Sequence, residues 1–112
     1  MMAQAKTLFQ KIWEEHLVAQ QPGSPGILYI DLHLIHEVTS PQAFSGLRGR
    51  GLKVRRPDRT VGTIDHSIPT LRTADGSLET RLSFADDLAR RQIAQLTENT
   101  AAAGIRLFGP GS

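Results

Sequence analysis

The chain has 112 residues, 39% hydrophobic and 21% charged, a composition that suits one domain or one piece of a larger domain and not a disordered chain. It contains no cysteine, which excludes disulfides, thiolate catalysis and any cysteine ligand to zinc or to an iron–sulfur cluster from this chain. The net charge of +2 does not by itself indicate nucleic-acid binding, and the lack of a membrane-spanning or secretory apolar run leads us to expect a cytoplasmic protein without a membrane partner.

The first predicted elements are a helix and a strand. Residues 7–18 should form the helix, because Thr7 and Gln10 have the spacing of a capping box, in which each side chain bonds the other residue's backbone amide. A loop rich in proline and glycine follows at 20–26. The apolar run 27–30 predicts a strand that is buried on both faces, as in a parallel sheet.

The middle of the chain predicts a short helix and a second strand. Ser40 should cap a helix over residues 41–50, because proline at the first turn loses no hydrogen bond. The run 60–64 predicts the strand, and 67–79 is mostly loop.

The last part predicts the longest helix, a third strand and a tail. Apolar residues recur every three or four positions over 80–103, and Gly104 is suited to end that helix. Residues 105–108 predict the strand, and 109–112 form an irregular tail.

Short strands that alternate with helices predict an α/β fold with a largely parallel sheet. Three strands are few for such a sheet, since both faces and both edges need cover. We therefore expect residues 1–112 to be a single partial domain of an incomplete chain.

Histidines and carboxylates cluster after the first two predicted strands, where ligand sites of open α/β sheets gather. They are Asp31, His33, His36, Glu37, Asp65 and His66. Two chemistries fit: a divalent metal site built from Asp31, His33, His36 and Asp65 or His66, or proton transfer on an anionic substrate. The same spacing also occurs in surface and capping residues, and we interpret His16, within the first helix, as structural.

The segment from Arg48 to Arg59 is basic and suggests a third, more distant possibility, a small nucleic-acid-binding module. It lacks interleaved aromatic residues for base stacking and matches none of the common nucleic-acid-binding modules, so a solvated or subunit-facing loop is the favoured interpretation.

The string from Tyr29 to Phe44, with its His-Glu-Val-Thr-Ser-Pro-Gln-Ala-Phe core, resembles the N-terminal region of the 3-isopropylmalate dehydratase large subunits, a family of the aconitase superfamily. The similarity continues through residues 46–48, the run 54–57 and the pair at 65–66, and covers about residues 6–108. It implies a partial three-layer α/β/α fold of the aconitase type.

The resemblance also implies an activity. Such enzymes are hydro-lyases of leucine biosynthesis that interconvert 2-isopropylmalate and 3-isopropylmalate by removing and re-adding water, with a [4Fe–4S] cluster and a separate small subunit. Asp65 and His66 correspond to the family's catalytic pair, and His36, Glu37 and Thr39 fall on substrate-binding positions.

The family's cluster ligands are three cysteines, and this chain has none. The resemblance therefore implies an N-terminal portion that binds no cluster alone and is inactive alone, with the rest of the large subunit and the small subunit as its partners.

Overall fold

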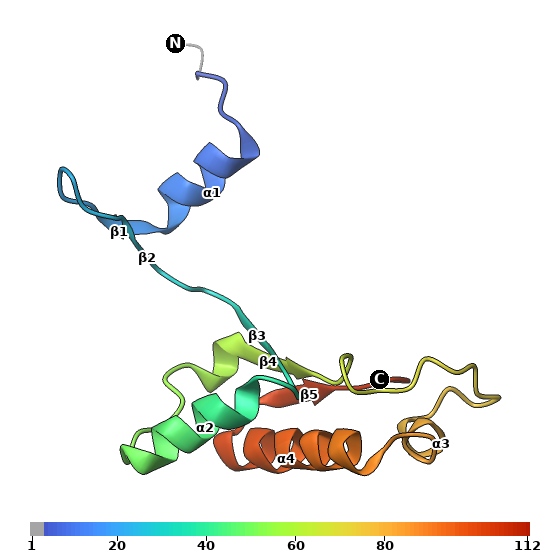
Figure 1. Ribbon diagram of the computed structural model, residues 1–112. Helices are drawn as coiled ribbons and strands as arrows, with labels where there is room; N and C mark the ends of the chain where they lie inside the picture. The colour runs from blue at the N-terminus through green and yellow to red at the C-terminus, as the bar shows by residue number, and fades with distance from the viewer. Residues whose placement is uncertain (1–3) are drawn as a thin grey trace. The chain divides into compact units, whose positions relative to one another are not determined.

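A computed structural model describes residues 4–112 (Figure 1). The structure divides into two compact units, one ending at Asp31 and one running from Leu32 to Ser112. Within the described residues no helix is both long and apolar enough to cross a membrane.

The first unit contains a helix and a two-stranded antiparallel sheet. Helix α1 (Leu8–His16) begins at the predicted capping box: the Gln10 amide donates to Thr7 Oγ1 and the Thr7 amide donates to Gln10 Oε1. The helix ends before residue 18, because the chain turns into strand β1 (Leu17–Ala19), which pairs with strand β2 (Ile27–Leu28).

The prediction for residues 27–30 is wrong in both partner and burial. Only Ile27 and Leu28 form a strand, their partner strand is antiparallel, and all four side chains are exposed. Helix α1 likewise buries none of its residues. The apolar side chains of this unit therefore form no core of their own within the described residues.

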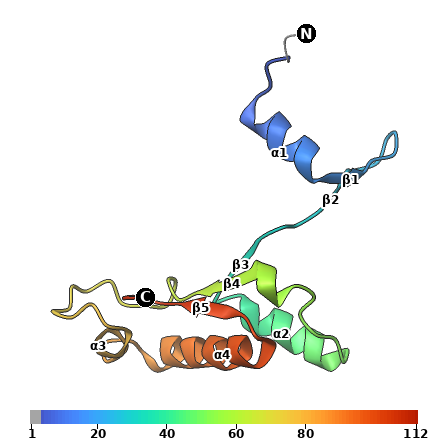
Figure 2. The same ribbon diagram turned by 180° about the vertical axis from the view of Figure 1, so that it is seen from behind.

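The second unit is built on a parallel sheet of three strands (Figures 1 and 2). Strands β3 (His33–His36), β4 (Thr60–Thr63) and β5 (Arg106–Phe108) lie in that order, with His36 opposite Thr63 and Thr63 opposite Phe108. The predicted second and third strands are confirmed. The first strand of the sheet is the histidine-bearing segment, which the sequence places after a strand.

The helices of this unit connect consecutive neighbouring strands. Helix α2 (Ser40–Gly49) and the 3-10 turn η1 (Pro57–Arg59) lie between β3 and β4; helices α3 (Leu78–Leu82) and α4 (Asp87–Ala103) lie between β4 and β5. Connections of one hand between strands added in sequence place their helices on the same face. Both views show α2 and α4 side by side below the sheet (Figures 1 and 2).

These features confirm the α/β class, with parallel strands and intervening helices. Of the three layers that the resemblance implies, residues 32–112 form two, the sheet and one helical layer. The predicted helix 80–103 is two helices instead, because the Asp86 side chain accepts a hydrogen bond from the Ala89 amide and so starts α4 anew. Gly104, with φ of 70°, ends α4 as predicted. Ser40 lies inside α2, whose N-cap is Thr39.

The core lies between the sheet and α4. Ile64, Ile93 and Leu96 are buried together, and residues from α3 and β5 pack against them. A Cβ atom built on Gly62, in the middle of β4, would lie 2.9 Å from Leu107 Cδ1 and 3.2 Å from Thr100 Cγ2. Glycine therefore allows α4 to approach the central strand closely. Close packing of α4 fixes the layer that supports the ends of β3 and β4.

Candidate functional site

The carboxyl ends of β3 and β4 meet at one edge of the sheet. His36 is the last residue of β3, and the pair Asp65–His66 follows β4 after a single residue. Because the two strands are parallel neighbours, both ends open on the same side, as the sequence predicts. Ligand sites of α/β sheets form at such edges.

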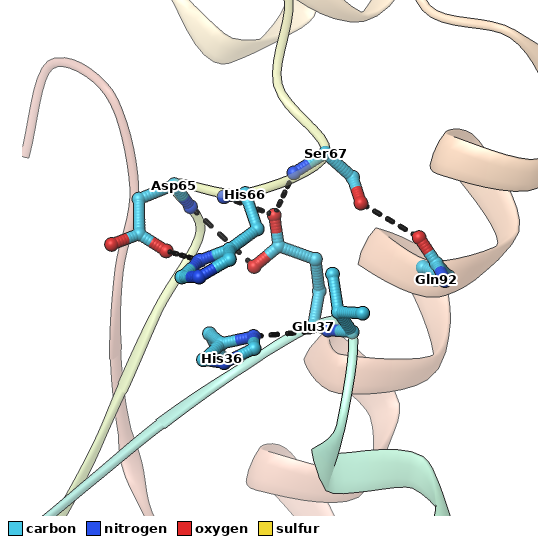
Figure 3. A network of polar contacts seen from close by, with 7 residues as sticks. His36, Glu37, Asp65, His66, Ser67 and Gln92 are labelled. Atoms are coloured by element: carbon cyan, nitrogen blue, oxygen red, sulfur yellow. Dashed lines mark hydrogen bonds and ion pairs between the residues drawn. The ribbon is translucent and has the colours of Figure 1, made fainter.

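The imidazole rings of His36 and His66 stack on one another at this edge (Figure 3). Their centroids are 3.6 Å apart and their planes differ by 8°. Of the three histidines that the sequence places at one edge, His33, His36 and His66, the last two therefore come together. Half of the His66 side chain is exposed, at 50%, so that its ring is accessible to a ligand.

Each ring has one nitrogen engaged and one without a hydrogen-bond partner among the described residues. His66 Nδ1 lies 2.6 Å from Asp65 Oδ1, so Nδ1 carries a proton and donates it to the carboxylate. His36 Nδ1 accepts a hydrogen bond of 3.2 Å from the Val38 amide, so the proton of the neutral ring is on Nε2. His36 can donate from Nε2, and His66 can give or take a proton there.

Glu37 lies beside this ring pair (Figure 3) and is fully buried, at 0% exposure. Its carboxylate accepts hydrogen bonds from three consecutive backbone amides, those of Asp65 at 3.4 Å, His66 at 2.7 Å and Ser67 at 2.5 Å (Figure 3). This geometry does not support the direct substrate contact expected for Glu37, because the carboxylate faces the protein backbone and no solvent reaches it.

Thr39 is exposed, and its hydroxyl makes no capping hydrogen bond to α2. Together with His36 it lines a cavity of about 560 Å³ beside β3 and α2. Apolar residues such as Phe44 and Leu47 and the cations Lys53 and Arg55 also line this cavity. His66 lines a different cavity, of about 410 Å³.

The metal site proposed from Asp31, His33, His36 and His66 does not assemble. His33 and His36 occupy opposite ends of β3, which separates their Cα atoms by roughly 10 Å at the rise of a strand. Asp31 belongs to the first unit, where it accepts from His16 at 3.0 Å. Of the predicted ligands in the second unit, His36 and His66 therefore lie together and His33 does not.

His36, Glu37 and His66 form a tighter group whose ligand atoms lie within 4.8 Å of one another. Their orientations are unsuited to a shared ion. The in-plane lone pairs of two parallel stacked rings do not converge, and the Glu37 carboxylate already accepts from three amides. The group therefore suits proton transfer better than metal binding.

The basic segment is partly used within the fold. Arg48 Nη1 donates to Asn99 Oδ1 at 2.8 Å, which links α2 to α4. Arg56 binds Asp58 through Nε at 2.9 Å and Nη2 at 2.7 Å, and this hydrogen-bonded guanidinium lowers the pKa of Asp58. These contacts give Arg48 and Arg56 structural roles and do not favour a nucleic-acid interface.

The sequence analysis identified His36 and His66 as site residues, but not the hydrogen bonds that fix the backbone around His66. The bonds from Glu37 to residues 65–67 span about thirty positions, and no local pattern indicates them. The Ser67 hydroxyl also donates a hydrogen bond to Gln92 Oε1 on α4 at 2.6 Å. This contact depends on the packing of α4 and could not be predicted from the sequence.

Comparison with known proteins gives a family match. The sequence profile of the aconitase family (aconitate hydratase) matches residues 10–112. A curated relative from Roseiflexus castenholzii (strain DSM 13941 / HLO8), named 3-isopropylmalate dehydratase large subunit, is 57% identical over 109 residues, which cover 96% of this chain and 22% of the relative. One of the same name from Anaeromyxobacter dehalogenans (strain 2CP-1 / ATCC BAA-258) is 55% identical over 111 residues, again 22% of its length. No solved structure matches the chain.

Proposed function

The chain belongs to the aconitase family, and from this premise we propose that it is the N-terminal portion of the large subunit of a cytoplasmic 3-isopropylmalate dehydratase. The complete enzyme would be a hydro-lyase that interconverts 2-isopropylmalate and 3-isopropylmalate in leucine biosynthesis. The chain spans 22% of the length of the two relatives described, so the remainder of a large subunit and a small subunit would complete the site.

The observation that carries this proposal is the stacked pair of histidines with complementary free nitrogens. In the dehydration direction, His66 as imidazolium gives its Nε2 proton to the substrate hydroxyl, which leaves as water. A base from the rest of the enzyme would take the proton of the neighbouring carbon, and the electron pair of that C–H bond forms the double bond. In the reverse direction the neutral ring takes the proton back from the incoming water. Asp65, bonded to Nδ1, holds the ring so that Nε2 stays free for the substrate.

His36 and Thr39 are the substrate-binding groups of this proposal. The Nε2–H of neutral His36 donates to a carboxylate oxygen of the hydroxy-diacid, and the Thr39 hydroxyl donates from the N-terminus of α2. Both side chains line the same cavity, so one substrate can contact both.

The iron–sulfur cluster of the family does not fit this chain's residues. Such clusters are held by thiolates, and the chain has no cysteine. The histidine and carboxylate group at the sheet edge does not offer converging ligands either. In the complete enzyme the cluster would be held by residues outside this chain.

A chimeric large subunit tests the proposal. Residues 6–108 of this chain replace the matching segment of the Roseiflexus castenholzii relative, which is produced with the small subunit of that organism. Formation of isopropylmaleate from 3-isopropylmalate is followed by absorbance, and iron content is measured in parallel. We expect dehydration comparable to that of the unaltered relative. A folded chimera with a full iron content and no dehydration would contradict the proposal.

A further inference from the structure

We propose that Glu37 is a positioning residue of this site: its carboxylate holds the turn Asp65–Ser67 and thereby sets the His66 ring against His36. This inference rests on the proposed function for its catalytic consequence. Its structural content, the control of the His66 ring by a buried carboxylate, can be tested without any turnover.

The first argument is the cost of burying Glu37. Its side chain is fully buried, and none of the salt bridges among the described residues involves it. A buried carboxylate is unfavourable unless hydrogen bonds compensate its charge. Here the compensation comes from three backbone amides, so the charge is tied to the conformation of this one turn.

The second argument is where those bonds act. The bond from the His66 amide, at 2.7 Å, and that from the Ser67 amide, at 2.5 Å, meet on the same oxygen, Oε1. They fix the backbone on both sides of the His66 Cα atom and hence the direction of its side chain. With half of that side chain exposed, surrounding packing contributes little to its orientation. The backbone therefore sets the position from which the ring reaches Asp65 and His36.

The third argument is the connection to His36. Glu37 follows His36 directly in the chain, at the end of β3, so one residue links the two stacked rings through the backbone of both strand ends. The Asp65 side chain and the ring of His36 then hold the two sides of the His66 imidazole (Figure 3). Without the carboxylate, the amides of the turn lose their acceptor and the turn loses its link to β3.

Two substitutions separate this role from a general effect on folding. Glu37→Met keeps a similar volume but removes both acceptor oxygens. Glu37→Gln keeps one oxygen, which can still accept from His66 and Ser67, and places its amide group toward the longer bond from Asp65. Glu98→Met is the matched control, since it makes the same change on the exposed face of α4.

The test is nuclear magnetic resonance of the 112-residue chain with isotope labels. In Glu37→Met we expect the His66 ring signals to lose the ring-current shift caused by His36, and the Nδ1–H bond to Asp65 to be lost. Amide signals of β5 and of the C-terminal half of α4 should stay in place. Glu37→Gln should retain most of the ring-current shift, and Glu98→Met all of it. Unchanged His66 ring signals in folded Glu37→Met overturn the proposal.

A measurement on the unaltered chain applies even where Glu37→Met does not fold. The amide protons of His66 and Ser67 should exchange with solvent much more slowly than in an unstructured peptide, because Glu37 accepts from both. Exchange at the unstructured rate also overturns the proposal.

The catalytic consequence is measured in the chimera described above. Glu37→Met should lower kcat with little change in KM, since it displaces the proton donor and leaves His36 and Thr39 in place. Glu37→Gln should restore most of kcat. An equal loss in both variants contradicts the positioning role. An inactive unaltered chimera contradicts the proposed function instead and leaves the resonance result intact.

Discussion

The two units of this molecule each contain a histidine paired with an aspartate, and the two pairs differ in what remains free. In the first unit, His16 Nδ1 lies 2.7 Å from the Ile12 carbonyl oxygen and Nε2 lies 3.0 Å from Asp31. In the second unit, His66 uses only Nδ1, toward Asp65. Both nitrogens of His16 face acceptors, so this ring is satisfied as an imidazolium and has no atom left for a ligand.

The comparison shows that a histidine–aspartate contact alone does not identify a site. What distinguishes His66 is a free nitrogen, a stacked second ring and a backbone held by a buried carboxylate. The two units also differ in how far their apolar side chains are buried. Leu8 and Phe9 are more than two thirds exposed in the first unit, whereas Leu96 is fully buried in the second.

The largest expected difference between the units is in catalysis. In the chimera, His66→Ala should lower turnover by about 10²- to 10⁴-fold, the usual contribution of a general acid or base. His16→Ala should leave turnover unchanged, because that ring has no free nitrogen. Initial rates and iron content check both variants. Equal rates for His66→Ala and the unaltered chimera would refute the role assigned to His66.

Core truncation is expected to be the next largest effect. Leu96→Ala should lower the free energy of unfolding by about 2–5 kcal/mol, because a fully buried leucine leaves a cavity between α4 and the sheet. Leu8→Ala, at a 73% exposed position, should change it by less than about 0.5 kcal/mol. Urea unfolding monitored by circular dichroism measures both. Similar losses at the two positions would mean that α1 is packed in solution.

Loss of a helix cap should have a smaller and region-specific effect. Asp86→Ala removes the acceptor for the Ala89 amide and should cost about 1 kcal/mol, with α4 kept in place by its buried residues. Thr7→Ala removes a similar bond from α1, which buries no residue and should therefore lose helical structure. Backbone chemical shifts distinguish the two outcomes, and an intact α1 in Thr7→Ala would contradict this expectation.

The smallest expected effect is on the pH dependence of the first unit. The hydrogen bond to the Ile12 carbonyl and then that to Asp31 raise the pKa of His16 above its ordinary value of about 6.5. A raised pKa in the folded state means that these bonds stabilise the unit at acidic pH, and that this stabilisation is lost as pH rises through the raised pKa. Titration of the His16 ring signals tests this, and Asp31→Asn should lower the midpoint.

Local chemistry made several elements predictable from sequence. The Thr7 capping box and the glycine that ends α4 act through their immediate neighbours, so their patterns indicate the correct helix ends. The prediction for the apolar run 27–30 was wrong because it depends on contacts with other parts of the chain. Strand burial depends on what packs against the faces of the sheet, and in the two-stranded sheet of β1 and β2 the side chains of Ile27 and Leu28 stay exposed.

The candidate site was predictable only in part for the same reason. The alternation of strands and helices predicts neighbouring parallel strands, but it places the first of them at 27–30, whereas the strand that brings His36 to His66 is β3. The exclusion of His33 depends on β3 beginning at that residue, because a strand then separates it from His36. The burial of Glu37 depends on contacts with the residues that follow β4. The sequence of residues 31–40 does not indicate these contacts.

The absence of a side chain at Gly62 affects the packing of α4 as well as strand β4. It sets the thickness of the layer between β4 and α4, because Thr100 occupies the space that any larger residue would need. Helix α4 also carries Gln92, whose Oε1 accepts a hydrogen bond from the hydroxyl of Ser67, the residue after His66. A methyl group added at Gly62 would thus press on Leu107 and on Thr100 of α4, the helix that also holds Ser67 through Gln92.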